Sequence, residues 1–296
     1  MATLKALKTR IGSVSSSEKI TGAMKMISSA KVHKNELELK KLLPFRNQVK
    51  SIMGHLLDTN TEFDSPLIEE REVRKVGVVV YGTDDGLCGA YNINIFKRLL
   101  IEIAGLREKY GNKVEITVYP IGKKMAKACL RLSAEGVRTI VPAGVDSKMS
   151  GDTVNAFTGQ LRSDFIAGTI DHVEVLYMRF VSMSRQIATV EQIFPVSSEA
   201  IEGDKGAAAN DNKMYIFEPD ANSIFNEVLP MFVLSTMQEI TIENRASEQA
   251  ARVMAMQSAN DNAKKLLDSL QLEYNKLRQQ SITTELLDIL GGQVER

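Results

Sequence analysis

The sequence has little of what marks secreted, membrane-spanning or nucleic-acid-binding proteins. Its 296 residues include only two cysteines, Cys88 and Cys129, which is too few for a disulfide framework and is consistent with a reducing compartment. The longest apolar runs, such as residues 76–81, are far shorter than the ~20 residues that span a bilayer. Lys and Arg (37) balance Asp and Glu (37), so net charge favours neither nucleic acid nor an anionic membrane. The N-terminus lacks an apolar signal core and is periodic from Leu4, so we interpret it as mature structure.

Motifs of catalysis and metal binding are also lacking. His33, His55 and His172 are far apart and do not have the spacing of zinc ligands. No serine occupies G-x-S-x-G, and Cys88 has no evident base beside it. Residues 82–92, GTDDGLCGAYN, follow a predicted strand but match neither G-x-G-x-x-G nor G-x-x-x-x-G-K-[ST]. The two aspartates in this segment would repel an anion, and no third ligand nearby completes a divalent metal site. We expect a tight structural turn there, and no catalytic residue, cofactor or metal in the chain.

What the chain does contain is a very long helical segment near its end. Residues 219–290 include no glycine and, after Pro219, only one further proline, Pro230. A helix of that length would extend about 105 Å, far more than a helix lying on a sheet needs. Small, polar and apolar residues recur in alternating steps of three and four, and this period of about 3.5 indicates a left-handed coiled coil. The seam consists of Ala246, Gln249, Val253, Met256, Asn260, Ala263, Leu267, Leu270, Tyr274 and Leu277.

A second long helix is predicted over residues 3–57, with a kink expected at Pro44. Its stretch 12–30 is rich in Gly, Ser and Ala. The Gly and Ser residues lower helix propensity, but such small residues let another helix approach closely. If the two helices pair antiparallel from a common level, paired position numbers sum to roughly 276, taking equal rise along both. Residues 12–30 would then face an Ala- and Ser-rich stretch at about 264–246.

The same register ends the pairing near residue 273 and leaves the end of the long helix without a partner in its own chain. That end is apolar, and a surface of this kind indicates a binding site for another protein. We therefore expect another chain to enclose it. Its apolar residues are Leu277, Ile282, Leu286, Leu287, Ile289 and Leu290.

The middle of the chain alternates between strands and helices, which is typical of a largely parallel sheet. Strands are predicted at 76–81, 114–119 and 137–141, helices at 92–110, 123–133 and 150–167, an antiparallel edge hairpin at 172–182 and 186–196, a mobile loop at 199–212 and a short strand at 214–217.

The predicted fold class is therefore α/β, with a long antiparallel N-/C-terminal helical coiled coil plus a Rossmann-like α/β domain. Its expected parts are a first coiled-coil helix at 1–57, an exposed connection at 58–75, the α/β domain at 76–218, and the second helix with its overhanging end at 219–296.

The first helix is strongly basic within a neutral protein. Residues 1–57 hold eleven Lys and Arg against three Glu. An acidic protein surface beside this helix is a plausible partner. Nucleic acid is less so, because the basic face lacks interleaved aromatic residues.

Three stretches resemble the γ-subunit family of F-type rotary ATP synthases. They are SSSEKITGAMKMISSAKV at 15–32, GTDDGLCGAYN at 82–92, and the run from Ser247 to Gly292, which carries Ile-Thr-x-Glu followed by an acidic residue and a glycine. The resemblance spans the whole chain. Two departures are visible: Asp85 stands where the family commonly has a basic residue, and Gly292 where it usually has Ala.

The resemblance implies a central-stalk rotor that couples proton flow through a membrane ring to conformational cycling of catalytic β subunits. It implies as partners the α and β subunits of a catalytic hexamer, the ε subunit and the membrane c ring. It also implies a peripheral membrane location on the cytoplasmic face of a bacterial inner membrane, with membrane association only through the ring. By similarity, Arg278, Gln279 and Thr283 match positions that bind a loop of a β subunit, and Met24 with Lys25 matches the position that faces an acidic region of β. Tyr215 and Glu218 match positions that contact the membrane ring and the ε subunit. The residues that would turn inside the hexamer sleeve are Ile282, Leu286, Leu287, Ile289 and Leu290.

Two alternatives from other classes remain open at this stage. One is a nucleotide-dependent α/β enzyme with helical oligomerisation arms. The other is a tethering or chaperone-like coiled coil, which would self-associate through its apolar end. Saturable nucleotide binding would favour the enzyme.

Overall fold

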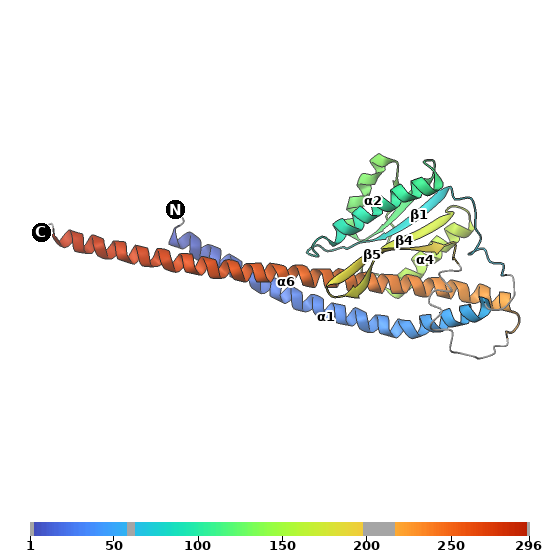
Figure 1. The fold of residues 1–296 in the computed structure, drawn as a ribbon, viewed down its shortest axis with the longest axis horizontal. Helices are drawn as coiled ribbons and strands as arrows, with labels where there is room; N and C mark the ends of the chain where they lie inside the picture. The colour runs from blue at the N-terminus through green and yellow to red at the C-terminus, as the bar shows by residue number, and fades with distance from the viewer. Residues whose placement is uncertain (1–2, 58–62, 198–216, 295–296) are drawn as a thin grey trace.

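A computed structural model describes residues 3–57, 63–197 and 217–294 of the chain. Two long helices run side by side and extend well beyond a five-stranded sheet (Figure 1). The elements in chain order are α1 (Leu4–Leu57), β1 (Lys75–Tyr81), α2 (Tyr91–Tyr110), β2 (Glu115–Ile121), α3 (Lys123–Cys129), the 3-10 helix η1 (Leu130–Glu135), β3 (Arg138–Thr139), α4 (Gly151–Ile166), β4 (His172–Ser182), β5 (Arg185–Phe194) and α6 (Ala221–Val294).

The sheet has the strand order β3-β2-β1-β4-β5. β1 pairs in parallel with β2 and β4, β2 pairs in parallel with β3, and β5 pairs antiparallel with β4 at the edge. Residues 76–81 of the central strand are all buried, because α2 and α3 cover one face of the sheet and α4, α6 and the end of α1 cover the other (Figure 1). The predicted largely parallel sheet with an edge hairpin is confirmed.

The helical pair is confirmed as well. α1 and α6 are antiparallel, since Asn260 of α6 donates to the backbone oxygen of Glu18 (2.7 Å) and Arg46 of α1 pairs with Glu239 (2.8 Å). Every residue of the predicted seam in α6 is buried or half-buried. α1 passes Pro44 without a break in the helix, and a kink at that residue stays a prediction.

The predicted register holds only at the far end of the pair. It placed Glu18 opposite about residue 258, close to the observed Asn260, but Arg46 opposite about residue 230 rather than the observed Glu239. α1 therefore advances by more residues than α6 over the same stretch. The reason is visible in Figure 1, where α1 curves around a straighter α6, so that the two helices do not advance equally per residue.

The small residues of α1 contribute to close approach only in part. Ser28 is buried, and a Cβ added at Gly22 would lie 3.4 Å from Asn260 Nδ2. Gly12, in contrast, is exposed and has nothing within 4 Å of an added Cβ. The hydroxyl of Ser16 is exposed too and donates to the backbone oxygen of Gly12 (3.0 Å). Gly12 and Ser16 therefore lie on the outer face of α1, and contact with α6 does not account for their small size.

Three further expectations differ from the structure. The strand predicted at 137–141 has only the two residues of β3, at the edge of the sheet and just before Pro142. The helix predicted at 123–133 changes to the 3-10 helix η1 after Cys129. The expected exposed connection is partly buried: the Phe63 ring stacks on Phe225 with centroids 4.4 Å apart, and Leu67 is buried in the core. The loop predicted at 199–212 lies outside the described residues.

Candidate functional site

The end of α6 that extends past α1 presents apolar side chains to solvent. α1 begins at Leu4, 14 residues before Glu18, so the pairing ends near residue 274 of α6. We call residues 278–294 of α6 the overhang. Ile282 is 49% exposed and Leu287 is 63% exposed, and Leu286, Ile289 and Leu290 are exposed too. Leu277, predicted with them, is half-buried. The predicted unpartnered apolar end is therefore present (Figure 1).

Three polar residues with predicted partner contacts lie on this overhang. Arg278, Gln279 and Thr283 are all exposed. The Thr283 hydroxyl donates to the backbone oxygen of Gln279 (2.9 Å) within the helix. The Arg278 and Gln279 side chains thus lie where a second molecule could reach them.

The remaining predicted contact residues lie at other levels of the helical pair. Met24 and Lys25 of α1 are half-buried and lie past the Glu18–Asn260 contact in the direction of Leu57, the last residue of α1. Arg278 lies in the opposite direction, about 27 Å from Asn260 along α6 at 1.5 Å per residue. Glu218 is exposed just before α6 begins, at the opposite end of this helix. Tyr215 lies outside the described residues. The structure therefore separates the predicted contacts into three levels instead of one site.

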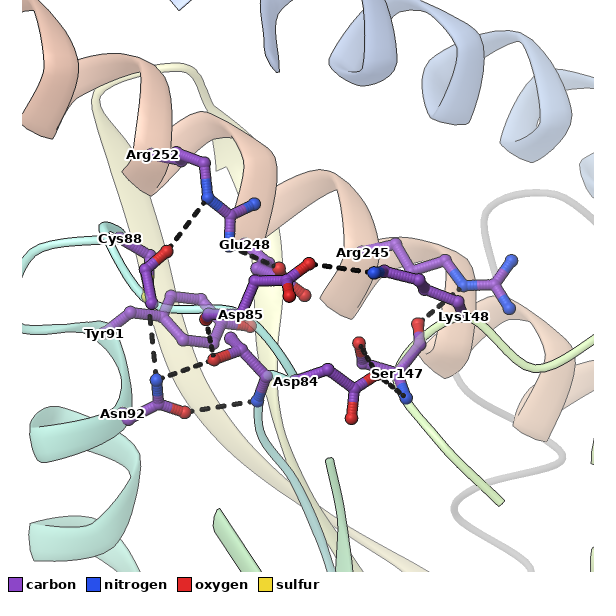
Figure 2. A network of polar contacts seen from close by, with 12 residues as sticks. Asp84, Asp85, Cys88, Tyr91, Asn92, Ser147, Lys148, Arg245, Glu248 and Arg252 are labelled. Carbon is purple, nitrogen blue, oxygen red and sulfur yellow. Dashed lines mark hydrogen bonds and ion pairs between the residues drawn. The ribbon is translucent and has the colours of Figure 1, made fainter. Parts of the chain in front are cut away.

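A second notable arrangement is a polar junction between the loop 82–92 and α6 (Figure 2). The Asp84 carboxylate accepts hydrogen bonds from the backbone N–H of Lys123 (2.9 Å), the backbone N–H of Ser147 (3.1 Å) and the Ser147 hydroxyl (2.7 Å). Asn92 closes the loop from the other side, because its Oδ1 accepts from the backbone N–H of Thr83 and its Nδ2 donates to the Thr83 hydroxyl. Burial opposes ionisation of Asp84, but these donors outweigh it and lower its pKa.

Asp85, one of the two departures from the family pattern, lies at the exposed surface of this junction. It forms an ion pair with Lys148 (2.8 Å), and both side chains are more than 60% exposed. The hydrogen bond with Lys148 is the main cause that lowers the Asp85 pKa. A basic residue at this position could not form the same pair.

The α6 side of the junction is buried, and sequence reasoning missed it. Arg252 donates through Nε to the backbone oxygen of Gly86 (3.2 Å) and forms an ion pair with Glu248 (2.7 Å), with both side chains at most 7% exposed. Burial raises the pKa of Glu248, and Arg252 opposes that shift. Arg245 donates to the backbone oxygens of Ser147 and Met149. These charged residues, spaced three and four apart on α6, were the available sequence signal.

Two buried tyrosines extend this attachment along α6. The Tyr81 hydroxyl lies 2.8 Å from the Thr241 hydroxyl, and the Tyr91 hydroxyl donates to Asn244 Oδ1 (2.7 Å). Burial raises the pKa of Tyr81 to about 12, so the hydroxyl stays protonated at neutral pH. The sheet is thereby fixed to α6 by directional bonds as well as by apolar packing.

This geometry makes the glycine-rich loop a structural turn, as predicted. The Asp84 oxygens are occupied by donors of the chain, and Cys88 is buried, with its pKa raised by desolvation. Within residues 3–57, 63–197 and 217–294, no group of three His, Cys, Asp or Glu side chains could hold a metal ion. None of the helices in the same ranges combines the length and the hydropathy that a membrane span requires.

Comparison with known proteins agrees with the predicted resemblance. The sequence model of the family described as ATP synthase matches residues 3–294. The ATP synthase gamma chain of Parabacteroides distasonis is 39% identical over 293 residues, which cover 99% of this chain and 98% of the relative. The chain belongs to the ATP synthase γ-chain family. Another member, from Cupriavidus pinatubonensis, is 37% identical and covers 99% of each chain.

Solved structures share the fold of this γ-chain family member. A chain of the Euglena gracilis mitochondrial ATP synthase described as OSCP/F1/c-ring in rotational state 3 has a TM-score of 0.62 at 22% identity and covers 98% of this chain and 93% of its own. A second, described as the rotor in rotational state 1, has a TM-score of 0.60 at 20% identity and covers 94% and 98%. The γ chain is the non-catalytic central-stalk rotor subunit of F-type ATP synthase. Family membership thus favours the rotor over the nucleotide-dependent enzyme and the tethering coiled coil.

Proposed function

We propose that α1 and α6 form a rotating shaft whose overhang turns inside a sleeve of alternating α and β subunits. The observation that carries this proposal is the run of exposed apolar residues on α6 past the first residue of α1, with Leu286 and Leu287 both more than half exposed. A water-exposed apolar helix end of this length favours an enclosing partner. An apolar bearing also suits rotation, because it needs no fixed hydrogen-bond geometry.

The polar contacts of the shaft would then report the rotary state to the β subunits. Arg278, Gln279 and Thr283 are exposed on the overhang, where they can bind a β-subunit loop in one orientation and lose it in the others. Met24 and Lys25 lie on the basic helix α1, where an acidic region of β is a complementary partner. Coupling follows if each β state contacts the asymmetric shaft with a different free energy.

The opposite end of the shaft would serve as the foot. Glu218 is exposed at the start of α6, and with Tyr215 it would contact the ε subunit and the polar loops of the membrane c ring. The related Euglena structure is described with F1 and the c-ring, which supports such a position for this chain. The chain would then be a peripheral membrane protein on the cytoplasmic face of a bacterial inner membrane, held there through the ring. Proton flow would turn the ring and the shaft with it.

Removing residues 280–296 from the assembled complex tests the bearing. We expect weaker assembly and less proton pumping per ATP hydrolysed, because the shaft loses its apolar contact with the sleeve. A matched pair of full-length variants separates the bearing from general surface effects: Leu287→Ser on the overhang should reduce pumping, whereas Leu130→Ser, also exposed but in the α/β domain, should not. Full coupling and stability of the truncated complex would contradict the bearing.

A further inference from the structure

Five polar and charged side chains of α1, α6 and the β4–β5 hairpin gather at the base of the helical pair. Arg46 of α1 forms an ion pair with the Glu239 carboxylate of α6: Nη1 donates to Oε1 (2.8 Å), and Nε lies 2.8 Å from Oε2. On the hairpin, the Tyr177 hydroxyl donates to Glu191 Oε1 at 2.6 Å. Glu243 follows Glu239 by one turn of α6. We call these five residues the base junction.

Glu243 differs from Glu239 and Glu191, the other carboxylates of this junction, because one of its oxygens, Oε2, is buried and has no hydrogen-bond partner among the described residues. The charged groups that act on it come from every element packed around it: Glu239 of α6, Glu191 of β5, Arg179 of β4 and Arg46 of α1. Glu239 and Glu243 are spaced i, i+4, where two like charges destabilise a helix.

A cleft of about 410 Å³ lies against the Arg46 and Glu191 side of the junction. Arg46 and Glu191 line it on the charged side, and Phe232 and Val233 of α6 form part of its apolar wall. The cleft lies between α1, β5 and α6. Because Glu243 is itself only half-buried, it can exchange protons with solvent while the helices stay paired.

We propose that Glu243 carries a proton when the base junction is closed, and that loss of this proton weakens the attachment of α1 to α6 around Arg46. An ionised Glu243 places a third carboxylate beside Glu239 and Glu191, repels Glu239 on the same helix and competes with it for Arg46. The base of the helical pair therefore loosens as the pH around it rises. This property belongs to the fold of the chain and does not depend on the proposed rotary role.

The ionisation behaviour of the group supports this direction. Burial first, and then the charges of Glu239 and Glu191, raise the pKa of Glu243 to about 7. A carboxyl group with a raised pKa in the folded state stabilises that state fully below its ordinary pKa, and the stabilisation is lost as pH rises through the folded value. The loss therefore falls between about pH 4.5 and pH 7, with a smaller part above pH 7.

Hydrogen–deuterium exchange of the full-length chain tests the proposal. After correction for intrinsic exchange rates, the open population of α1 residues 43–53 is expected to rise by up to about tenfold between pH 6 and pH 8. In Glu243→Gln, which cannot lose a proton, this rise should disappear. In Glu191→Gln, which removes a neighbouring negative charge, the rise should move to lower pH.

Two controls distinguish the base junction from general effects. Glu227→Gln replaces an exposed glutamate of the same helix and should behave like the wild type. Residues 95–106 of α2, on the other face of the sheet, should show no pH-dependent change, which excludes global unfolding. An equal pH dependence in wild type and Glu243→Gln would overturn the proposal. Loss of rotary coupling in either variant would bear on the proposed function alone.

Discussion

Asp84 shows how one carboxylate can fix a glycine-rich loop. Its oxygens accept three hydrogen bonds, two from the backbone of segments that otherwise have no reason to meet, Lys123 at the start of α3 and Ser147 before α4. The Asp84 carboxylate therefore fixes the loop by accepting the hydrogen bonds that a bound phosphate would accept in a phosphate-binding loop. Its negative charge would repel an anion at this position.

Replacing Asp84 by Ala should lower the free energy of unfolding by about 1–3 kcal/mol, because two backbone donors and a hydroxyl lose their acceptor. Urea unfolding of the full chain measures it. Since the pKa of Asp84 is lowered in the folded state, the difference from wild type should be present above the ordinary aspartate pKa and vanish as pH falls through the folded value. The control Asp85→Ala removes only an exposed ion pair and should change stability by less than about 1 kcal/mol.

The buried pair Arg252–Glu248 makes a second prediction at this scale. Arg252→Met should destabilise the chain by about 3–5 kcal/mol at neutral pH, because Glu248 is left as an uncompensated buried charge. Its effect should be smaller at acidic pH, where Glu248 takes up a proton. The double variant Arg252→Met, Glu248→Leu should regain most of the stability. A double variant no more stable than the single one would contradict this account of the pair.

At the scale of elements, α6 changes its environment twice along its length. Near its start, Phe225 and Leu229 are buried in the core of the α/β domain. Farther along, Met256 and Asn260 are buried in the seam with α1, and beyond Leu270 most side chains are exposed. One continuous helix therefore packs into the domain core, pairs with α1 in the coiled coil and ends in the overhang.

The same substitution at two positions of α6 should separate these environments. Leu270→Ala removes a side chain that is 3% exposed and should cost about 2–4 kcal/mol in the isolated chain. Leu287→Ala, at 63% exposure, should change stability by less than about 0.5 kcal/mol. Thermal or urea unfolding of both variants measures the difference. Comparable destabilisation would mean that the chain itself covers its overhang.

Elements that depend on local periodicity could be predicted from the sequence. The seam from Ala246 to Leu277 and the buried run at 76–81 were both found, because each repeats at the period of its own secondary structure. The predicted register of α1 against α6 was correct near Glu18 but wrong near Arg46, because the spacing of residues in the sequence does not show how strongly a helix curves. β3 was too long in the prediction, because edge pairing, not the apolar run at 137–141, sets its two residues.

The polar junction could not be predicted for a different reason. Arg252 and Gly86 are 166 positions apart. From its neighbours in the sequence alone, Arg252 is expected at the surface of a helix and Gly86 in a turn. Only the packing of α6 across the sheet brings them together. The partner residues Arg278, Gln279, Thr283, Met24 and Lys25 stay predictions, because their contacts belong to other chains.

At the scale of the whole molecule, the sheet and both long helices form one connected body. α6 is bonded to Tyr81 of β1, to Tyr91 of α2 and, through Arg252, to the loop between them, and α1 is bonded to α6 at both Arg46 and Glu18. A torque applied at the foot therefore reaches the overhang through α6 without passing through the chain segments that connect the elements. Relative sliding of α1 and α6 is not needed for rotation.

A covalent link between the two helices tests this directly. Thr21 Oγ1 and Asn260 Nδ2 lie 3.3 Å apart, so Thr21→Cys with Asn260→Cys places two thiols within reach of a short bis-maleimide. Cys88 and Cys129 are buried and should not react. In the assembled complex, the linked shaft should pump protons with ATP as well as the same variant before linking, because α1 and α6 turn as one body. A linked complex that hydrolyses ATP but no longer pumps would show instead that the helices must move against each other.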